Sequence, residues 1–124
     1  MVIIIDYGLG NLGSIYNMLR WLGCRDMEIT SDKSKIKNAD KLILPGVGHF
    51  RKAMTNLSDL DLISVLNKKV ILGNTPIMGI CLGMQLLFET SEEGNCNGLG
   101  WIKGKVTKFD KSKDNANQNI PHMG

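Results

Sequence analysis

Short apolar runs alternate with helix-like patterns along the 124 residues. Runs rich in aliphatic and β-branched residues are typical of buried strands in a parallel sheet. They predict strands over residues 2–5, 27–30, 41–44 and 76–81, with a late strand over 104–109. Apolar residues at helical spacing lie between these runs. They predict helices over residues 15–22, 33–38, 49–57, 60–66 and 82–89.

This alternation predicts the fold class and the edge at which chemistry occurs. Strands that alternate with helices form an α/β fold, with a mostly parallel sheet and helices on both faces. Ligands of such sheets bind at the carboxyl ends of the strands. Glycine-containing turns follow Asp6, follow Leu44 and surround Cys81. We therefore expect these three turns to meet in space.

Composition and charge exclude several classes of protein. Fifteen basic and twelve acidic residues give a net charge of +3, an excess too small and too dispersed to predict binding to nucleic acid. The lysine-rich segment 103–113 is interpreted as a solvated hairpin or loop. No apolar run is long enough to span a membrane, and no secretory signal is visible, so we expect no membrane partner and a cytoplasmic location. Three cysteines without a C-x-x-C pair predict neither a disulfide framework nor a metal site.

The strongest chemical signal is the segment Gly79-Ile80-Cys81-Leu82-Gly83. The pattern G-x-C-x-G, between an apolar strand and a helix, is the thiol form of the nucleophile elbow. Small neighbours leave room for a strained backbone, and the start of the next helix favours a thiolate. The amide of Leu82 is expected to be free to bind a developing oxyanion. The alternative is a buried cysteine packed between strand and helix.

Two other glycine-containing turns support different hypotheses. Glycines in the segment 45–48 (PGVG) allow backbone amides to face a ligand, so this turn is a candidate for the other half of an oxyanion hole. The segment 8–13 (GLGNLG) has the spacing G-x-G-x-x-G that is found in dinucleotide-binding folds. That hypothesis also needs an acidic residue after the second strand, for which Glu28 and Asp32 are candidates.

Four segments carry a resemblance to a known family. GICLGMQLLFETSEE, around Cys81, resembles the nucleophile segment of the class I (triad) glutamine amidotransferases. Together with IDYGLGNLGS, LPGVGHF and IPHMG, in this order, it resembles the glutaminase subunit of imidazole glycerol phosphate synthase. The resemblance implies a flavodoxin-like three-layer fold. It also implies that a cysteine thioester releases glutamate and ammonia from glutamine, without a cofactor or metal, and that the ammonia serves histidine biosynthesis.

The resemblance also implies a role for individual residues. Cys81 matches the nucleophile, Val47 and Leu82 match the oxyanion positions, and Gly46 and Gly48 shape that turn. Gln85 and Glu93 match positions that bind the substrate glutamine. The partner implied is a cyclase subunit, a (β/α)8 barrel that forms a heterodimer with the glutaminase. The residues that match the surface facing it are Asn11, Pro121, His122, Met123 and Gly124.

The sequence departs from the family pattern in its histidines. The family's catalytic histidine and glutamate lie beyond the point that corresponds to residue 124, and neither His49 nor His122 matches the base. We expect structural or interface roles for both. Residues 1–124 are therefore expected to be the N-terminal part of a glutaminase domain, inactive alone. Two alternatives stay open: a related subunit that supplies ammonia for sugar modification in surface polysaccharide, and a non-catalytic binding module.

Overall fold

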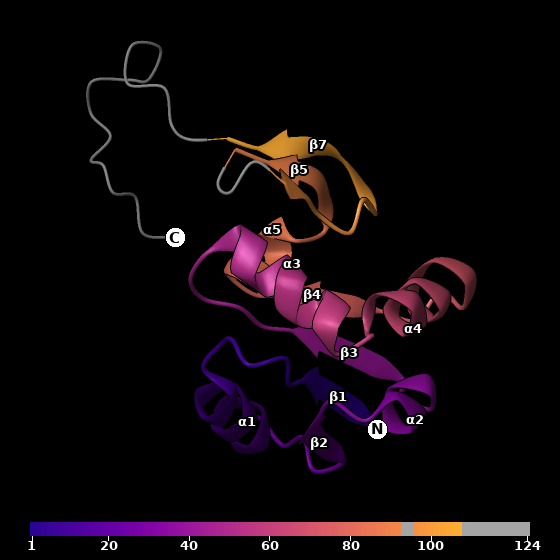
Figure 1. The fold of residues 1–124 in the computed structure, drawn as a ribbon. Helices are drawn as coiled ribbons and strands as arrows, with labels where there is room; N and C mark the ends of the chain where they lie inside the picture. Colours follow the sequence, from indigo (N-terminus) through magenta and orange to yellow (C-terminus); the bar gives the residue numbers. More distant parts are fainter. Residues whose placement is uncertain (93–95, 108–124) are drawn as a thin grey trace.

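In the part of the chain that the structure describes, the main sheet has four parallel strands (Figure 1). The computed structural model describes residues 1–92 and 96–107. The strands lie in the order β2-β1-β3-β4. Their bounds are β1 Val2–Ile5, β2 Met27–Thr30, β3 Lys41–Leu44 and β4 Ile77–Gly79. The four strands and their parallel pairing confirm the prediction from the sequence, although β4 is shorter than expected.

Helices lie on both faces of this sheet, as predicted, but they cover the two faces unequally. The helices between β1 and β4 are α1 Leu12–Trp21, α2 Lys33–Lys37, α3 Phe50–Asp59 and α4 Ile63–Asn67, the last continued by the π-helical turn η1 Lys68–Leu72. On one face, α2, α3 and α4 contribute buried residues such as Ile36, Phe50 and Leu66 to the main core. No residue of α1 is buried, and its Leu19 borders an apolar groove of about 290 Å³ on the sheet.

The expected helix over residues 60–66 is wrong at its start. The helix begins only at Ile63, because Asp61 has a φ of 56°, which interrupts the helical backbone between α3 and α4. Leu62 is fully buried there, and its amide donates to the carbonyl of Leu57. The apolar residues that suggested a longer helix therefore serve the turn between two helices.

The expected helix over residues 82–89 is also wrong beyond its first turn. It ends as α5 Leu82–Gln85, and the chain continues into strand β5 Phe88–Ser91. This strand belongs to a second sheet with β6 Cys96–Asn97 and β7 Ile102–Val106, in the order β6-β5-β7. The amides of Gly98 and Gly100 donate to the carbonyls of Glu89 and Phe88, so pairing with a later segment replaces helical bonds.

The late strand is present but differs from the expectation in place and neighbours. It begins at Ile102, pairs in parallel with β5, and is not part of the main sheet. Lys103 and Lys105 lie exposed on this strand rather than in a loop, whereas residues 108–113 of the lysine-rich segment fall outside the described residues. None of the helices in residues 1–92 and 96–107 is long and apolar enough to cross a membrane.

Candidate active site

The turns after β1, β3 and β4 meet at one edge of the main sheet, as the sequence predicts. A Cβ atom added to Gly10 would lie 3.0 Å from Cβ of Pro45, and one added to Gly46 would lie 2.9 Å from the amide nitrogen of Gly83. The three turns are therefore in contact through their backbones. A side chain at Gly46 would collide with Tyr7 and the backbone of Gly83, and one at Gly10 would be tight against Pro45.

Cys81 occupies a strained position at this meeting point. Its φ is 55° and its ψ is −122°, a combination that costs energy for a residue with a side chain. The residue is exposed and lies directly before α5. Strain of this kind at an exposed cysteine is typical of a nucleophile held on a sharp turn between a strand and a helix.

The two glycines that flank Cys81 are required by close contacts between backbones. A Cβ on Gly79 would lie 2.6 Å from Cα of Met84, inside the turn itself. A Cβ on Gly83 would lie 1.9 Å from the carbonyl oxygen of Leu44 at the end of β3. The pattern G-x-C-x-G thus has two physical causes: one glycine closes the elbow, and the other allows α5 to approach β3.

The backbone amides around Cys81 are engaged, which corrects the expectation that the amide of Leu82 is free. The amide of Leu82 is not free, because it donates to the carbonyl of Gly46 at 3.2 Å. The next two amides, of Gly83 and Met84, donate to the carbonyls of Ile80 and Cys81 at 2.9 and 3.0 Å. With α5 limited to four residues, the helix N-terminus expected to favour a thiolate is reduced to one turn whose first amides are already bonded.

Residues 45–48, called here the 45–48 turn, lie beside the elbow at Cys81 and include both buried and exposed residues. Gly46 is buried against Leu82, and Val47 is 52% exposed. Gly48 has a φ of 101°, a region that glycine enters without strain. The turn therefore presents Val47 to solvent next to the Cys81 elbow, and Gly48 gives it conformational freedom.

The remaining candidate residues are only partly described. Gln85 is the last residue of α5 and is half-buried. Asn11 is exposed directly before α1, and its carbonyl accepts the amide of Ile15 at 3.2 Å. Glu93 and the segment 121–124 lie outside the described residues.

His49 has a structural role, as expected. Its Nδ1 accepts the amide of Arg51 at 3.2 Å, and the residue is the N-cap of α3. A cap of this kind satisfies one of the amides that a helix leaves unpaired at its start. His122 lies outside the described residues. The nitrogen that His49 commits to the helix is not available to accept a proton from a nucleophile.

Two of the three glycines of the segment 8–13, Gly8 and Gly10, lie close to other parts of the protein rather than to an open ligand site, whereas a Cβ on Gly13 would meet nothing within 4 Å. Gly10 packs against Pro45, and a Cβ on Gly8, which has a φ of 90°, would lie 3.2 Å from Nδ2 of Asn56. The two acidic candidates are also engaged. Glu28 accepts from Lys35 at 2.5 Å, and Asp32 accepts the amide of Ser34 at 2.8 Å as the N-cap of α2.

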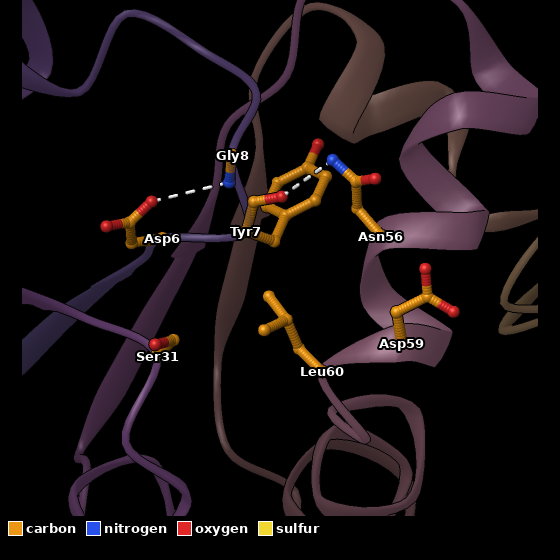
Figure 2. Close-up of a pocket in the computed structure, with 7 residues that line it drawn as sticks. All are labelled: Asp6, Tyr7, Gly8, Ser31, Asn56, Asp59 and Leu60. Carbon is orange, nitrogen blue, oxygen red and sulfur yellow. Dashed lines mark hydrogen bonds between the residues drawn. The ribbon is translucent and has the colours of Figure 1, made fainter.

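A pocket of about 410 Å³ beside the first turn contains two residues that sequence reasoning missed, Tyr7 and Asn56 (Figure 2). The Tyr7 hydroxyl donates to the carbonyl of Pro45 at 2.5 Å, and Asn56 Nδ2 donates to the carbonyl of Tyr7 at 3.0 Å. The signal in the sequence was an aromatic residue in a turn otherwise rich in glycine. Within the part of the chain that the structure describes, no group of three His, Cys, Asp or Glu residues is placed to hold a metal ion.

Comparison with known proteins agrees with this geometry. Residues 3–124 match the family described as "Glutamine amidotransferase class-I". The chain is 55% identical over 124 residues to "Imidazole glycerol phosphate synthase subunit HisH 2" of Methanococcus maripaludis, covering 100% of this chain and 59% of the relative. It is 50% identical over 125 residues to "Imidazole glycerol phosphate synthase subunit HisH" of Sulfurimonas denitrificans, with the same two coverages.

A solved structure gives the same fold. The crystal structure of a glutamine amidotransferase superposes with a TM-score of 0.73 at 19% identity, covering 86% of this chain and 56% of that one. The chain thus spans 59% of the length of the two relatives described above.

Proposed function

The chain belongs to the class-I glutamine amidotransferase family, and from this premise we propose that it is the glutamine-hydrolysing part of an imidazole glycerol phosphate synthase. The observation that carries the proposal is Cys81, held exposed at a φ of 55° between two glycines that admit no side chain. Membership of the family indicates glutamine hydrolysis as the reaction. The similarity to subunits of the synthase over all 124 residues favours ammonia transfer to the cyclase of that synthase over ammonia transfer for sugar modification.

The proposed reaction begins with attack of the Cys81 sulfur on the side-chain amide carbon of glutamine. The C–S bond forms, and the carbonyl oxygen gains the negative charge of a tetrahedral intermediate. When this intermediate collapses, the C–N bond breaks, and the leaving nitrogen takes a proton and departs as ammonia. Water then attacks the thioester, which releases glutamate and restores the thiol. Gln85 and Glu93 are proposed to bind the substrate.

One of the two backbone amides assigned to the oxyanion, that of Leu82, is engaged in the structure as it stands. The Leu82 amide donates to Gly46, so this bond must break before the amide can bind an oxyanion. The carbonyl of Gly46 and the amide of Val47 belong to one planar peptide and point in opposite directions. Rotation of that peptide, with Gly48 absorbing the change, would release Leu82 and turn the Val47 amide toward the same place. We therefore assign the oxyanion site to Leu82 and Val47 after this rotation.

The acid–base group is proposed to lie outside residues 1–124. His49 caps α3 through its Nδ1, so we do not assign it proton transfer. The histidine and glutamate implied by the family are proposed to follow the matched region, which makes residues 1–124 the N-terminal part of the glutaminase domain. Asn11 and residues 121–124 are proposed to contact a (β/α)8-barrel cyclase that receives the ammonia.

Mass spectrometry after treatment with a glutamine-mimicking electrophile tests the proposal. The chain alone is compared with the chain joined to the remaining segment of the Methanococcus maripaludis relative, each with a cyclase present. Selective modification of Cys81 in the joined protein, with Cys24 and Cys96 unmodified as internal controls, is the expected result. If Cys81 is modified in neither protein, the cysteine is structural and the proposal is wrong.

A further inference from the structure

We propose that Tyr7 is a positioning residue for the 45–48 turn, holding the Pro45 carbonyl so that the next peptide faces the Leu82 amide. The proposal deepens the function assigned above and rests on it, because it concerns the same oxyanion site. Tyr7 lies in the turn after β1, and that turn supplies none of the groups assigned to the chemistry. Its link to that chemistry is a single hydroxyl group.

The contact between Tyr7 and Pro45 is buried and short. Tyr7 is 1% exposed, and its hydroxyl donates to the Pro45 carbonyl at 2.5 Å. Burial raises the pKa of the Tyr7 phenol above its ordinary value, so the group stays protonated and remains a donor. A buried carbonyl that loses its donor keeps its desolvation penalty, which makes this contact costly to break.

Tyr7 is itself held from a different direction. Asn56 of α3 donates from Nδ2 to the Tyr7 carbonyl at 3.0 Å, and Asp6 accepts the amide of Gly8 at 3.3 Å (Figure 2). These bonds tie the residues on both sides of Tyr7, through contacts that do not involve the 45–48 turn. The hydroxyl is therefore positioned by the turn after β1 and by α3, and the hydroxyl positions the 45–48 turn.

The position of the hydroxyl determines which peptide of the turn can move. A Cβ on Gly46 would lie 2.5 Å from Oη of Tyr7, so the hydroxyl touches Gly46 as well as bonding to Pro45. With Pro45 anchored at one end and Gly48 free to change at the other, rotation is confined to the peptide between Gly46 and Val47. That peptide is the one whose carbonyl now accepts the Leu82 amide.

Amide hydrogen exchange, followed by NMR on the 124-residue chain, tests this role without requiring turnover. Tyr7→Phe removes only the hydroxyl, and Tyr16→Phe on α1 is the matched control. In the Tyr7 variant we expect exchange at Leu82 to rise by about tenfold or more. Exchange at Ile80, whose amide donates to the Leu44 carbonyl at 3.0 Å, should stay within about twofold.

Two results would overturn the proposal: unchanged exchange at Leu82, or an equal rise at Leu82 and Ile80, which indicates a general loss of stability. If the Tyr7 variant does not fold, Asn56→Ala is measured in its place. This substitution removes the hydrogen bond to the Tyr7 carbonyl and leaves the rings of Tyr7 and Pro45 unchanged. A selective rise at Leu82 supports the positioning role there too, and an unchanged or uniform profile contradicts it. Failure of Cys81 labelling counts against the proposed function alone, because the exchange comparison does not depend on it.

Discussion

Replacement of Gly83 by alanine should destabilise the protein strongly, because the added methyl group overlaps the backbone of β3. The new Cβ would lie 1.9 Å from the carbonyl oxygen of Leu44, 2.8 Å from its carbon and 3.1 Å from the carbonyl carbon of Pro45. All three are main-chain atoms, so no side chain can rotate away. The two elements must separate by about 1.5 Å to reach ordinary contact.

The size of the effect follows from this geometry. Overpacking in a core costs about 1–3 kcal/mol, and a clash between backbones belongs at the upper end, about 3 kcal/mol. For a chain of this length the free energy of unfolding is roughly 6–19 kcal/mol, so the variant should fold with reduced stability. With a slope of about 2 kcal/mol per molar urea, the unfolding midpoint should fall by about 1.5 M.

Urea unfolding followed by tryptophan fluorescence measures this shift. Trp101 is half-buried and donates from Nε1 to Asn67 at 2.7 Å, so its emission reports the folded state. Gly13→Ala is the matched control. The new Cβ meets nothing within 4 Å, and alanine within α1 should raise the free energy of unfolding by about 0.5–1 kcal/mol. Equal midpoints for Gly83→Ala and the unmodified protein would refute the inferred contact between α5 and β3.

Three other predictions follow from single features. Cys81→Ser should abolish glutamine hydrolysis by the protein joined to its relative's remaining segment and bound to cyclase, and normal turnover in a glutaminase assay would contradict the nucleophile. His49→Ala should cost about 1 kcal/mol in urea unfolding through loss of a cap, while labelling of Cys81 stays unchanged; reduced labelling would place His49 in the chemistry. Asp40 and Asp26 raise the pKa of the Met1 ammonium. The stability that the charged ammonium contributes to the folded protein should therefore be complete below about pH 8, and it should be lost as pH rises through the higher folded-state pKa. A urea unfolding midpoint that is independent of pH from 7 to 10 would contradict this.

Much of the fold was predictable because its signals are local. The strands β1 and β3 are runs of mostly aliphatic residues that end before Asp6 and Pro45. For both, the predicted bounds agree with the bounds in the structure. The helix expected over 82–89 failed because its apolar residues suit a strand equally well, and pairing with residues 96–102 decided between them. The spacing of apolar residues alone does not indicate that this later segment will pair with residues 86–91.

The candidate site divides in the same way. Cys81 and its glycines were identifiable, since a sharp turn requires small residues at particular positions in the sequence. The state of the amides was not: the bond between Leu82 and Gly46 joins residues 36 positions apart. Tyr7 was not singled out, because its distinction is a contact with Pro45, which is 38 residues away.

The sequence by itself determined the α/β class, the four strands of the main sheet and the sharp turn at Cys81, because each depends on residues close together along the chain. Only the tertiary structure decided that the 8–13 segment packs on Pro45, that the amide of Leu82 donates to the carbonyl of Gly46, and that the Tyr7 hydroxyl donates to the carbonyl of Pro45. These features depend on distances between strands that are brought together by burial of the core. Burial is non-directional, and the backbone contacts that result are specified by shape rather than by local pattern.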